Sequence, residues 1–160
     1  MSVNIERRVV DPGDDAFLEA AWDLKETIRR AEGVLKQRRG FFSQAYRRAT
    51  VYLFFEPDSE VIAGFAAARR DGYILFLAVD PDHRGKGFGE RLVAQVADNH
   101  RRVTCHARTT NENAIAFYRH LGFDVVRRID NYYEDGGDAF YLRLGEPESL
   151  TDRLAAFLRR

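Results

Sequence analysis

The sequence predicts an α/β fold, because strand-like runs and helix-like segments alternate along its 160 residues. Residues 73–79 (YILFLAV) are apolar or aromatic without alternation, which is long enough for a strand and too short for an ordinary helix. Asp80-Pro81 then ends the strand, and the glycine-rich segment 84–89 (RGKGFG) opens into a helix predicted over 90–99. We expect 73–79 to form a strand that is buried on both faces.

Composition limits the number of domains and the kinds of partner. Hydrophobic residues make up 45% of the chain, including 12 Phe and 7 Tyr, so we expect one compact domain with a sizeable core. The 25 basic residues balance the 25 acidic ones, so no net charge attracts the protein to nucleic acid or to a membrane. A single Cys excludes an internal disulfide, and we find neither a signal core nor the roughly 20 apolar residues of a membrane span. These features predict a cytoplasmic protein.

The N-terminal elements are predicted from periodicity and turn residues. A short strand over 5–10 precedes a helix that Asp14 or Asp15 can cap and that runs to Glu32, where Gly33 ends it. The next segment is basic and aromatic and is predicted to contain a second short helix. The later elements are strands over 50–56, 61–70, 103–108, 125–129 and 139–144, and a helix over 113–121.

The C-terminal segment carries a further helical pattern. Beyond Pro147, apolar side chains fall on one helical face at Leu150, Leu154, Phe157 and Leu158. We therefore expect a domain over 1–146 and a helical extension over 147–160, which packs on its own domain or forms a dimer contact.

The glycine-rich loop predicts a binding site for a pyrophosphate. Three glycines in five residues let the chain turn tightly and let amide N–H groups at a helix start approach an anion. A nucleotide P-loop needs Ser or Thr after Gly-Lys, but Gly87 follows Lys86 here. A dinucleotide-binding loop needs an acidic residue at the end of the next strand, which here ends in Ala107-Arg108.

Two sequence blocks resemble the GCN5-related N-acetyltransferase (GNAT) family. Arg84, Gly87 and Gly89 meet its acetyl-CoA loop pattern R/Q-x-x-G-x-G/A, and the strand before the loop is also similar. Residues 111–123 (NENAIAFYRHLGF) match the family block N-x-x-A-I-x-x-Y-x-x-x-G-F. The resemblance implies a GNAT fold, with a mixed, mostly antiparallel central sheet of about seven strands flanked by helices. The C-terminal helix would be an addition to the family core.

The resemblance implies acetyl-CoA as cosubstrate. Backbone groups of the strand before the loop would bind pantetheine and the thioester region, and the loop would bind pyrophosphate. Asn111 would contact the coenzyme arm and Asn113 would cap the helix, although these two roles could be exchanged. The implied coenzyme contacts are Leu77, Ala78, Val79, Arg84, Gly85, Lys86, Gly87, Phe88, Gly89, Asn111 and Asn113.

The resemblance also implies catalytic residues. Tyr118 matches the family tyrosine that points at the coenzyme sulfur, so it is predicted to be the general acid. His106 stands where many members carry Glu. Some N-terminal acetyltransferases of the family have histidine there and tyrosine at the start of the central strand, here Tyr73, and these residues act through an ordered water. The alternative is a structural histidine.

Other residues of this strand and the remaining histidines bear on the same chemistry. Strand alternation places Thr104, His106 and Arg108 on one face. Cys105, on the opposite face, is predicted to be a small buried hydrophobic residue. His83 and His120 lack metal-ligand spacing, so no metal is predicted.

Aromatic residues supply candidate acceptor contacts. Tyr132-Tyr133 resembles the hairpin with which ribosomal-protein and other N-terminal acetyltransferases hold the acceptor backbone. Phe41 and Phe42 lie between the first two helices, a segment that usually walls the acceptor site in the family. The alternative for both pairs is ordinary surface packing, and residues 34–46 contain no peptide-recognition motif that we identify.

The predicted function is acetyl transfer from acetyl-CoA to a primary amine by direct attack in a ternary complex. A protein or peptide N-terminal α-amine is the favoured acceptor. The alternatives are a small-molecule amine, a lysine, or an acyl-CoA-binding module without catalysis. We expect a monomer or a homodimer, and neither nucleic acid nor membrane as a partner.

Overall fold

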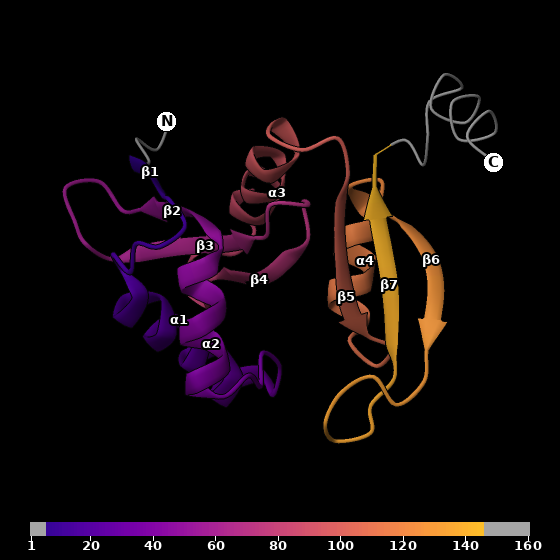
Figure 1. Ribbon diagram of the computed structural model, residues 1–160. Helices are drawn as coiled ribbons and strands as arrows, with labels where there is room; N and C mark the ends of the chain where they lie inside the picture. The colour runs from indigo at the N-terminus through magenta and orange to yellow at the C-terminus, as the bar shows by residue number, and fades with distance from the viewer. Residues whose placement is uncertain (1–5, 146–160) are drawn as a thin grey trace. The chain divides into compact units, whose positions relative to one another are not determined.

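The computed structural model describes residues 6–145 (Figure 1). The chain divides into two compact units, the first ending at Asn99 and the second beginning at His100. The seven predicted strands and the four predicted core helices are all found in the described range, whereas the helix predicted over 147–160 lies outside it. The elements are β1 (Glu6–Val10), α1 (Leu18–Glu32), α2 (Arg39–Arg48), β2 (Thr50–Phe55), β3 (Ile62–Ala68), β4 (Ile74–Val79), the 3₁₀ turn η1 (Pro81–His83), α3 (Phe88–Asp98), β5 (Val103–Arg108), α4 (Glu112–His120), β6 (Asp124–Ile129) and β7 (Ala139–Leu144).

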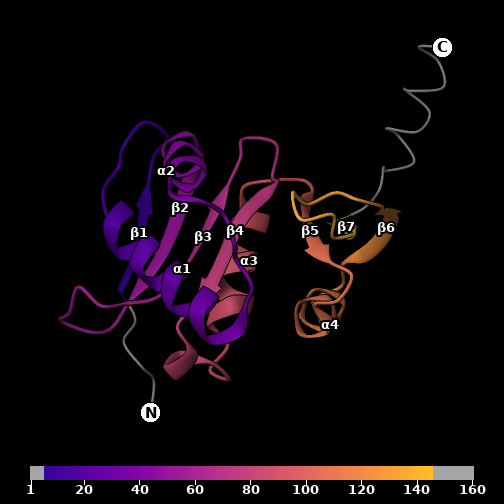
Figure 2. The same ribbon diagram turned by 90° about the horizontal axis from the view of Figure 1, so that it is seen from below.

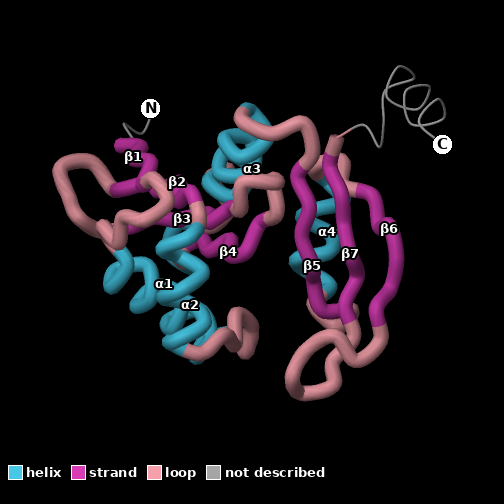
Figure 3. The backbone as a smooth tube through the Cα atoms, in the orientation of Figure 1, coloured by secondary structure: helices cyan, strands magenta, loops and turns pink. Residues whose placement is uncertain are grey.

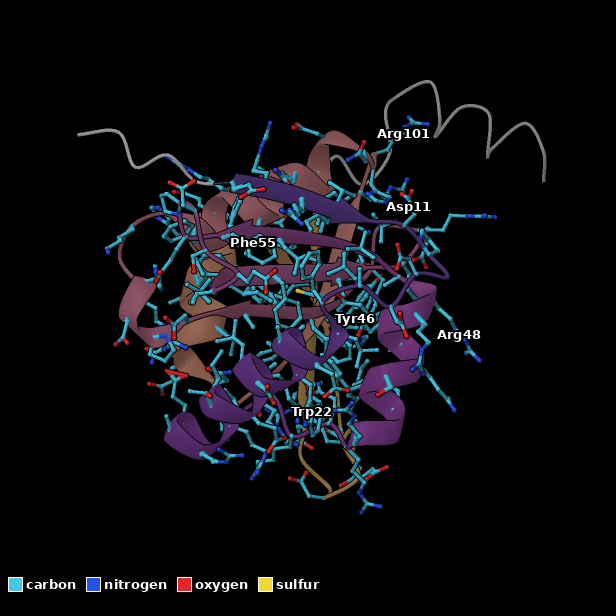
Figure 4. All side chains as sticks on the ribbon, turned by 90° about the vertical axis from the view of Figure 1, so that its left-hand side faces the viewer. Asp11, Trp22, Tyr46, Arg48, Phe55 and Arg101 are labelled. Carbon is cyan, nitrogen blue, oxygen red and sulfur yellow. The ribbon has the colours of Figure 1, made fainter. Side chains whose placement is uncertain are left out.

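The first unit is a four-stranded antiparallel sheet in the order β1-β2-β3-β4, with α1 and α2 on one face and α3 on the other (Figure 1). Figure 4 shows the side chains, with Tyr46 between the helices and the sheet, Trp22 between α1 and α2, and Arg48 pointing away from the sheet. The fully or nearly fully buried side chains of this core include Leu18, Ala21, Ile28, Phe42, Tyr46, Val51, Leu53, Phe65 and Phe76.

Helix α3 covers the opposite face of the sheet through Phe88, Leu92, Val93 and Val96, which are buried. Gly64 on β3 permits this close approach, because a Cβ atom there would lie 3.2 Å from Leu92 Cδ1 and 2.9 Å from the Ala78 carbonyl oxygen. Strand β3 is therefore buried along its whole length.

Strand β4 is buried on one face only, so the prediction of burial on both faces was wrong. Ile74, Phe76 and Ala78 are buried, and the three residues that alternate with them are half-buried. The physical reason is that β4 is the last strand of its sheet, so it has a neighbouring strand, β3, on one side only. Its half-exposed positions are apolar, which is why the sequence does not show the alternation.

The ends of α1 confirm one expectation and correct another. Gly33 ends the helix in the left-handed conformation, with φ 69°, and its N–H donates to the Arg29 carbonyl at 2.8 Å. Neither aspartate caps the start, because Phe17 is the N-cap and no side chain caps it. Asp14 instead accepts a hydrogen bond from the Ala16 amide at 2.9 Å, so it stabilises the turn before the helix.

The second unit is a three-stranded antiparallel sheet in the order β5-β7-β6, with α4 on one face (Figures 2 and 3). Along β5, Val103, Cys105 and Ala107 are buried and their neighbours are half-buried, which confirms the predicted alternation. His106 pairs with Tyr141 of β7, which in turn pairs with Arg127 of β6.

None of the helices in the two described units is long and apolar enough to cross a membrane.

Candidate functional site

The glycine-rich loop between β4 and α3 has the backbone conformation that glycine favours. Gly85 and Gly87 have φ angles of 77° and 81°, and Gly87 is the N-cap of α3. Apart from the adjacent residues, no atom of residues 6–145 lies within 4 Å of the position that a Cβ atom would occupy at either glycine. The loop therefore presents its main chain to the surroundings.

Its amide groups fit a pyrophosphate. The first N–H groups of a helix have no acceptor within the helix, and among the described residues none accepts from the amides of Gly85, Lys86 or Gly87. Lys86 is exposed and adds a positive charge. Together with the positive end of the α3 dipole, these donors provide the environment that a diphosphate needs.

The start of this loop is fixed by a histidine that the sequence analysis did not connect with it. His83 Nδ1 lies 2.6 Å from Asp80 Oδ2, and Nε2 lies 2.8 Å from Glu56 Oε1 at the end of β2. The ring also packs edge-on against Phe88, with 5.8 Å between ring centroids. His83 therefore joins the ends of β2 and β4 to the first residue of α3.

Two predicted coenzyme contacts have side chains occupied elsewhere. The Arg84 guanidinium forms an ion pair with Glu32 of α1 and lies 3.4 Å from the Val79 carbonyl oxygen. Phe88 is buried and packs against Phe54, with centroids 5.9 Å apart. Any coenzyme contact of Phe88 is thus limited to its main chain.

The strand before the loop has its other predicted residues in place. Leu77 and Val79 are half-buried and Ala78 is buried, and all three pair with β3. Tyr73 lies just before β4, with the Arg69 guanidinium 4.5 Å from its ring centroid.

Phe41 and Phe42 differ in exposure although they are adjacent in α2. Phe41 is 57% exposed, whereas Phe42 has no exposed surface and packs against Trp22, Tyr46, Phe65 and Phe76. Only Phe41 has a surface that could contact an acceptor, so the structure places Phe42 in the core.

In the second unit, the His106 imidazole contacts two tyrosine rings. Tyr132 stacks on it, with centroids 4.3 Å apart and an interplanar angle of 14°, and the Tyr132 hydroxyl is 3.3 Å from His106 Nδ1. The ring centroid of Tyr141 lies 5.0 Å from that of His106. The sequence predicts site roles for His106 and Tyr132 but not for Tyr141, which only the strand register places beside the imidazole.

Helix α4 and its N-cap carry three further predicted site residues, Asn111, Asn113 and Tyr118. Asn111 is its N-cap and accepts a hydrogen bond from the Ala114 amide at 3.1 Å, while Asn113 is exposed. The cap is therefore Asn111 rather than Asn113. Asn111 is in the capping position because it precedes the first helical residue, Glu112. The helix predicted over 113–121 therefore began one residue too late.

Tyr118 is the buried residue of α4 and packs edge-on against Phe117 and Phe123. Burial raises the pKa of the neighbouring Cys105 thiol to about 12, and a hydrogen bond with Tyr118 opposes this effect. Cys105 is thus an unreactive buried thiol at neutral pH, in agreement with its predicted role.

The described residues contain no group of three or more His, Cys, Asp and Glu side chains that could hold a metal ion.

The fold and the glycine-rich loop are typical of enzymes that transfer an acyl group from acyl-coenzyme A. The profile of the Acetyltransferase (GNAT) family matches residues 16–123, more than half of the chain, and the protein therefore belongs to this family.

Individual relatives and solved structures are similar to the chain over different shares of their length. The chain is 38% identical over 82 residues to "N-alpha-acetyltransferase MAK3" of Arabidopsis thaliana, covering 48% of this chain and 43% of the relative. It superposes on the ribosomal-protein-S18-alanine N-acetyltransferase of Escherichia coli with a TM-score of 0.67 and 25% identity, covering 91% and 100% of the two chains. It superposes on Arabidopsis thaliana Naa50 in complex with the bisubstrate analogue CoA-Ac-MVNAL with a TM-score of 0.65 and 25% identity, covering 89% of this chain and 99% of that chain. The chain spans between 26% and 43% of the length of the first three curated relatives.

Proposed function

We propose that the protein transfers an acetyl group from acetyl-CoA to the N-terminal α-amine of a protein or peptide. Membership of the GNAT family supports acetyl transfer. The names of the similar Arabidopsis and Escherichia coli proteins support an α-amine as the acceptor. Naa50, also similar in fold, was solved with an analogue that joins coenzyme A to a peptide.

The coenzyme site of this proposal is the loop over residues 84–89. The left-handed glycines, the unused amides and the α3 N-terminus fit the pyrophosphate of coenzyme A. Lys86 would neutralise part of its charge, while Arg84 would hold the loop against α1 rather than bind phosphate through its side chain.

The reaction requires two proton movements. The amine nitrogen attacks the thioester carbonyl carbon, the C–S bond breaks, the amine loses a proton and the coenzyme thiolate gains one. We assign Tyr118 as the donor to the thiolate. His106, acting through a water with Tyr73, would accept the proton from the amine.

The single observation that best supports the acceptor class is the position of His106. Its imidazole is half-buried on β5 and contacts the rings of Tyr132 and Tyr141. An α-amine has a pKa of about 7.8, so roughly one in ten is neutral at pH 7, whereas a lysine with a pKa of about 10.4 is neutral in fewer than about one in a thousand molecules. An imidazole base suits the first acceptor better than the second.

The test uses peptides that contain lysine and have either a free or a blocked N-terminus, with thiol release and mass spectrometry as readouts. We expect acetylation at the free N-terminus, no reaction with the blocked peptide, and slower turnover in His106→Ala. Modification mainly on lysine, or turnover only with small amines, would exclude the N-terminal acceptor. Binding of coenzyme A without any turnover would identify a non-catalytic module.

A further inference from the structure

The loop between β6 and β7 is a compact turn rather than an extended connection. The Tyr133 amide donates to the Gly137 carbonyl at 3.0 Å, and the Gly136 amide donates to the Tyr133 carbonyl at 2.9 Å. The Asp138 carboxylate accepts from the Asn131 amide at 2.9 Å. These bonds fix the shape of the loop but do not by themselves fix its position relative to β5.

The Arg108 side chain of β5 contacts the loop at two residues, Tyr133 and Asp135. The Arg108 guanidinium carbon lies 4.0 Å from the Tyr133 ring centroid, and Nη1 lies 3.0 Å from Asp135 Oδ1. The same Asp135 oxygen accepts from the Gly137 amide at 3.0 Å. Burial raises the pKa of Tyr133 to about 12, so at neutral pH its ring faces the guanidinium as an uncharged phenol.

Gly137 leaves the room that the guanidinium fills. A Cβ atom at Gly137 would lie 2.4 Å from Arg108 Nη1 and 3.0 Å from Asp135 Oδ1. The loop and the arginine therefore fit each other closely, and a methyl group at this glycine would displace the ion pair.

The loop carries Tyr132, the residue that stacks on His106. The rings of Tyr132 and Tyr133 are nearly perpendicular, at 88° with centroids 5.0 Å apart, so a fixed Tyr133 constrains the neighbouring ring. His106 and Arg108 lie on the same face of β5. The strand thus presents the imidazole and, one position further along that face, the cation that holds the loop.

We propose that Arg108 is a positioning residue that keeps Tyr132 stacked over His106 by binding Tyr133 and Asp135. The consequence for catalysis rests on the proposed function, in which His106 is the base. The stacking itself does not, because it is a property of the second unit and can be measured without substrate.

The first experiment follows the His106 imidazole by NMR in the full chain without ligands. A stacked tyrosine ring shifts the imidazole resonances and gives nuclear Overhauser contacts between the two side chains. We expect both signatures to be lost in Arg108→Ala and partly kept in Arg108→Lys, which retains the positive charge. Arg119→Ala, at an exposed arginine of α4, is the matched control and should leave them unchanged.

Gly137→Ala provides an independent variant, because it retains every charge and displaces the guanidinium by contact alone. We expect it to lose the same NMR signatures as Arg108→Ala. Persistence of the Tyr132–His106 contacts in both folded variants would overturn the proposal.

Turnover measurements test the link to catalysis. In both variants kcat should fall about 10- to 100-fold, the scale of a misplaced catalytic group, while the affinity for coenzyme A is unchanged. If the wild-type protein showed no turnover, the proposed function would fail while the NMR result still decided the role of Arg108. Lost stacking with unchanged kcat would overturn the catalytic consequence.

Discussion

At the scale of single residues, adjacent side chains have separate tasks because a helix turns about 100° per residue. Phe42 is fully buried under Phe65 and Phe76, whereas Phe41 is mostly exposed. We expect Phe42→Ala to lower the free energy of unfolding by about 3–5 kcal/mol, the cost of emptying a core site. Phe41→Ala should leave stability nearly unchanged and raise KM for the acceptor. Denaturant unfolding and steady-state kinetics check the pair, and equal stability losses would contradict the assignment.

Tyr118 permits a second test at this scale, because Tyr118→Phe keeps the ring that packs on Phe123 and removes only the hydroxyl. A lost proton donor should lower kcat about 100-fold or more without changing the affinity for coenzyme A. Tyr46→Phe is the matched control, since the buried Tyr46 hydroxyl donates to the Ala16 carbonyl at 2.6 Å in the first unit. It should cost about 1 kcal/mol of stability and leave kcat unchanged. An unchanged kcat in Tyr118→Phe would remove the hydroxyl from the mechanism.

At the scale of elements, His83 connects the ends of β2 and β4 to the glycine-rich loop, which is the proposed coenzyme site. A carboxylate oxygen lies against each ring nitrogen of His83, and a glutamine, which carries a single side-chain nitrogen, cannot reproduce both contacts. We expect His83→Gln to weaken coenzyme A binding by about 1 kcal/mol, or roughly fivefold, with little change in kcat at saturation. Calorimetry measures this effect, and His120→Gln, at an exposed histidine, should have none. An affinity equal to the wild type would show that the loop keeps its shape without this contact.

The elements themselves were predictable because their signals are local. Apolar periodicity and turn residues located seven strands and four helices, and Gly33 located the end of α1. The two family blocks located the glycine-rich loop and Tyr118. The contacts that organise the site join segments far apart in sequence, such as Glu56 with His83 or Arg84 with Glu32, and no local pattern marks them. Register likewise decides that Tyr141 lies beside His106.

At the scale of the whole molecule, stability should depend on pH through a buried lysine and its partner. Lys25 is fully buried on α1, donates to Glu26 at 3.0 Å and also binds the Gln37 carbonyl of the segment before α2. Burial lowers the pKa of Lys25, and its hydrogen bond with Glu26 opposes that shift. Lys25 thus joins α1 to the segment before α2, and the Glu26 carboxylate is its side-chain partner.

Glu26 therefore gives a prediction with a defined pH window. Its hydrogen bond with Arg29, followed by that with Lys25, lowers the pKa of its carboxyl from 4.5 to about 2. A carboxyl group whose pKa is lowered by folding stabilises the folded state at pH values above its unfolded-state pKa. This contribution is lost as the pH falls from about 4.5 to about 2. We expect Glu26→Gln to be less stable than the wild type by about 1–3 kcal/mol at pH 7, and the two proteins to converge as the pH falls through this window. Urea unfolding at several pH values measures the difference, with Glu19→Gln, at the exposed partner of Arg39, as a control of little effect. A difference that stayed constant down to pH of about 2 would mean that packing, rather than the charge of Glu26, holds this part of the molecule together.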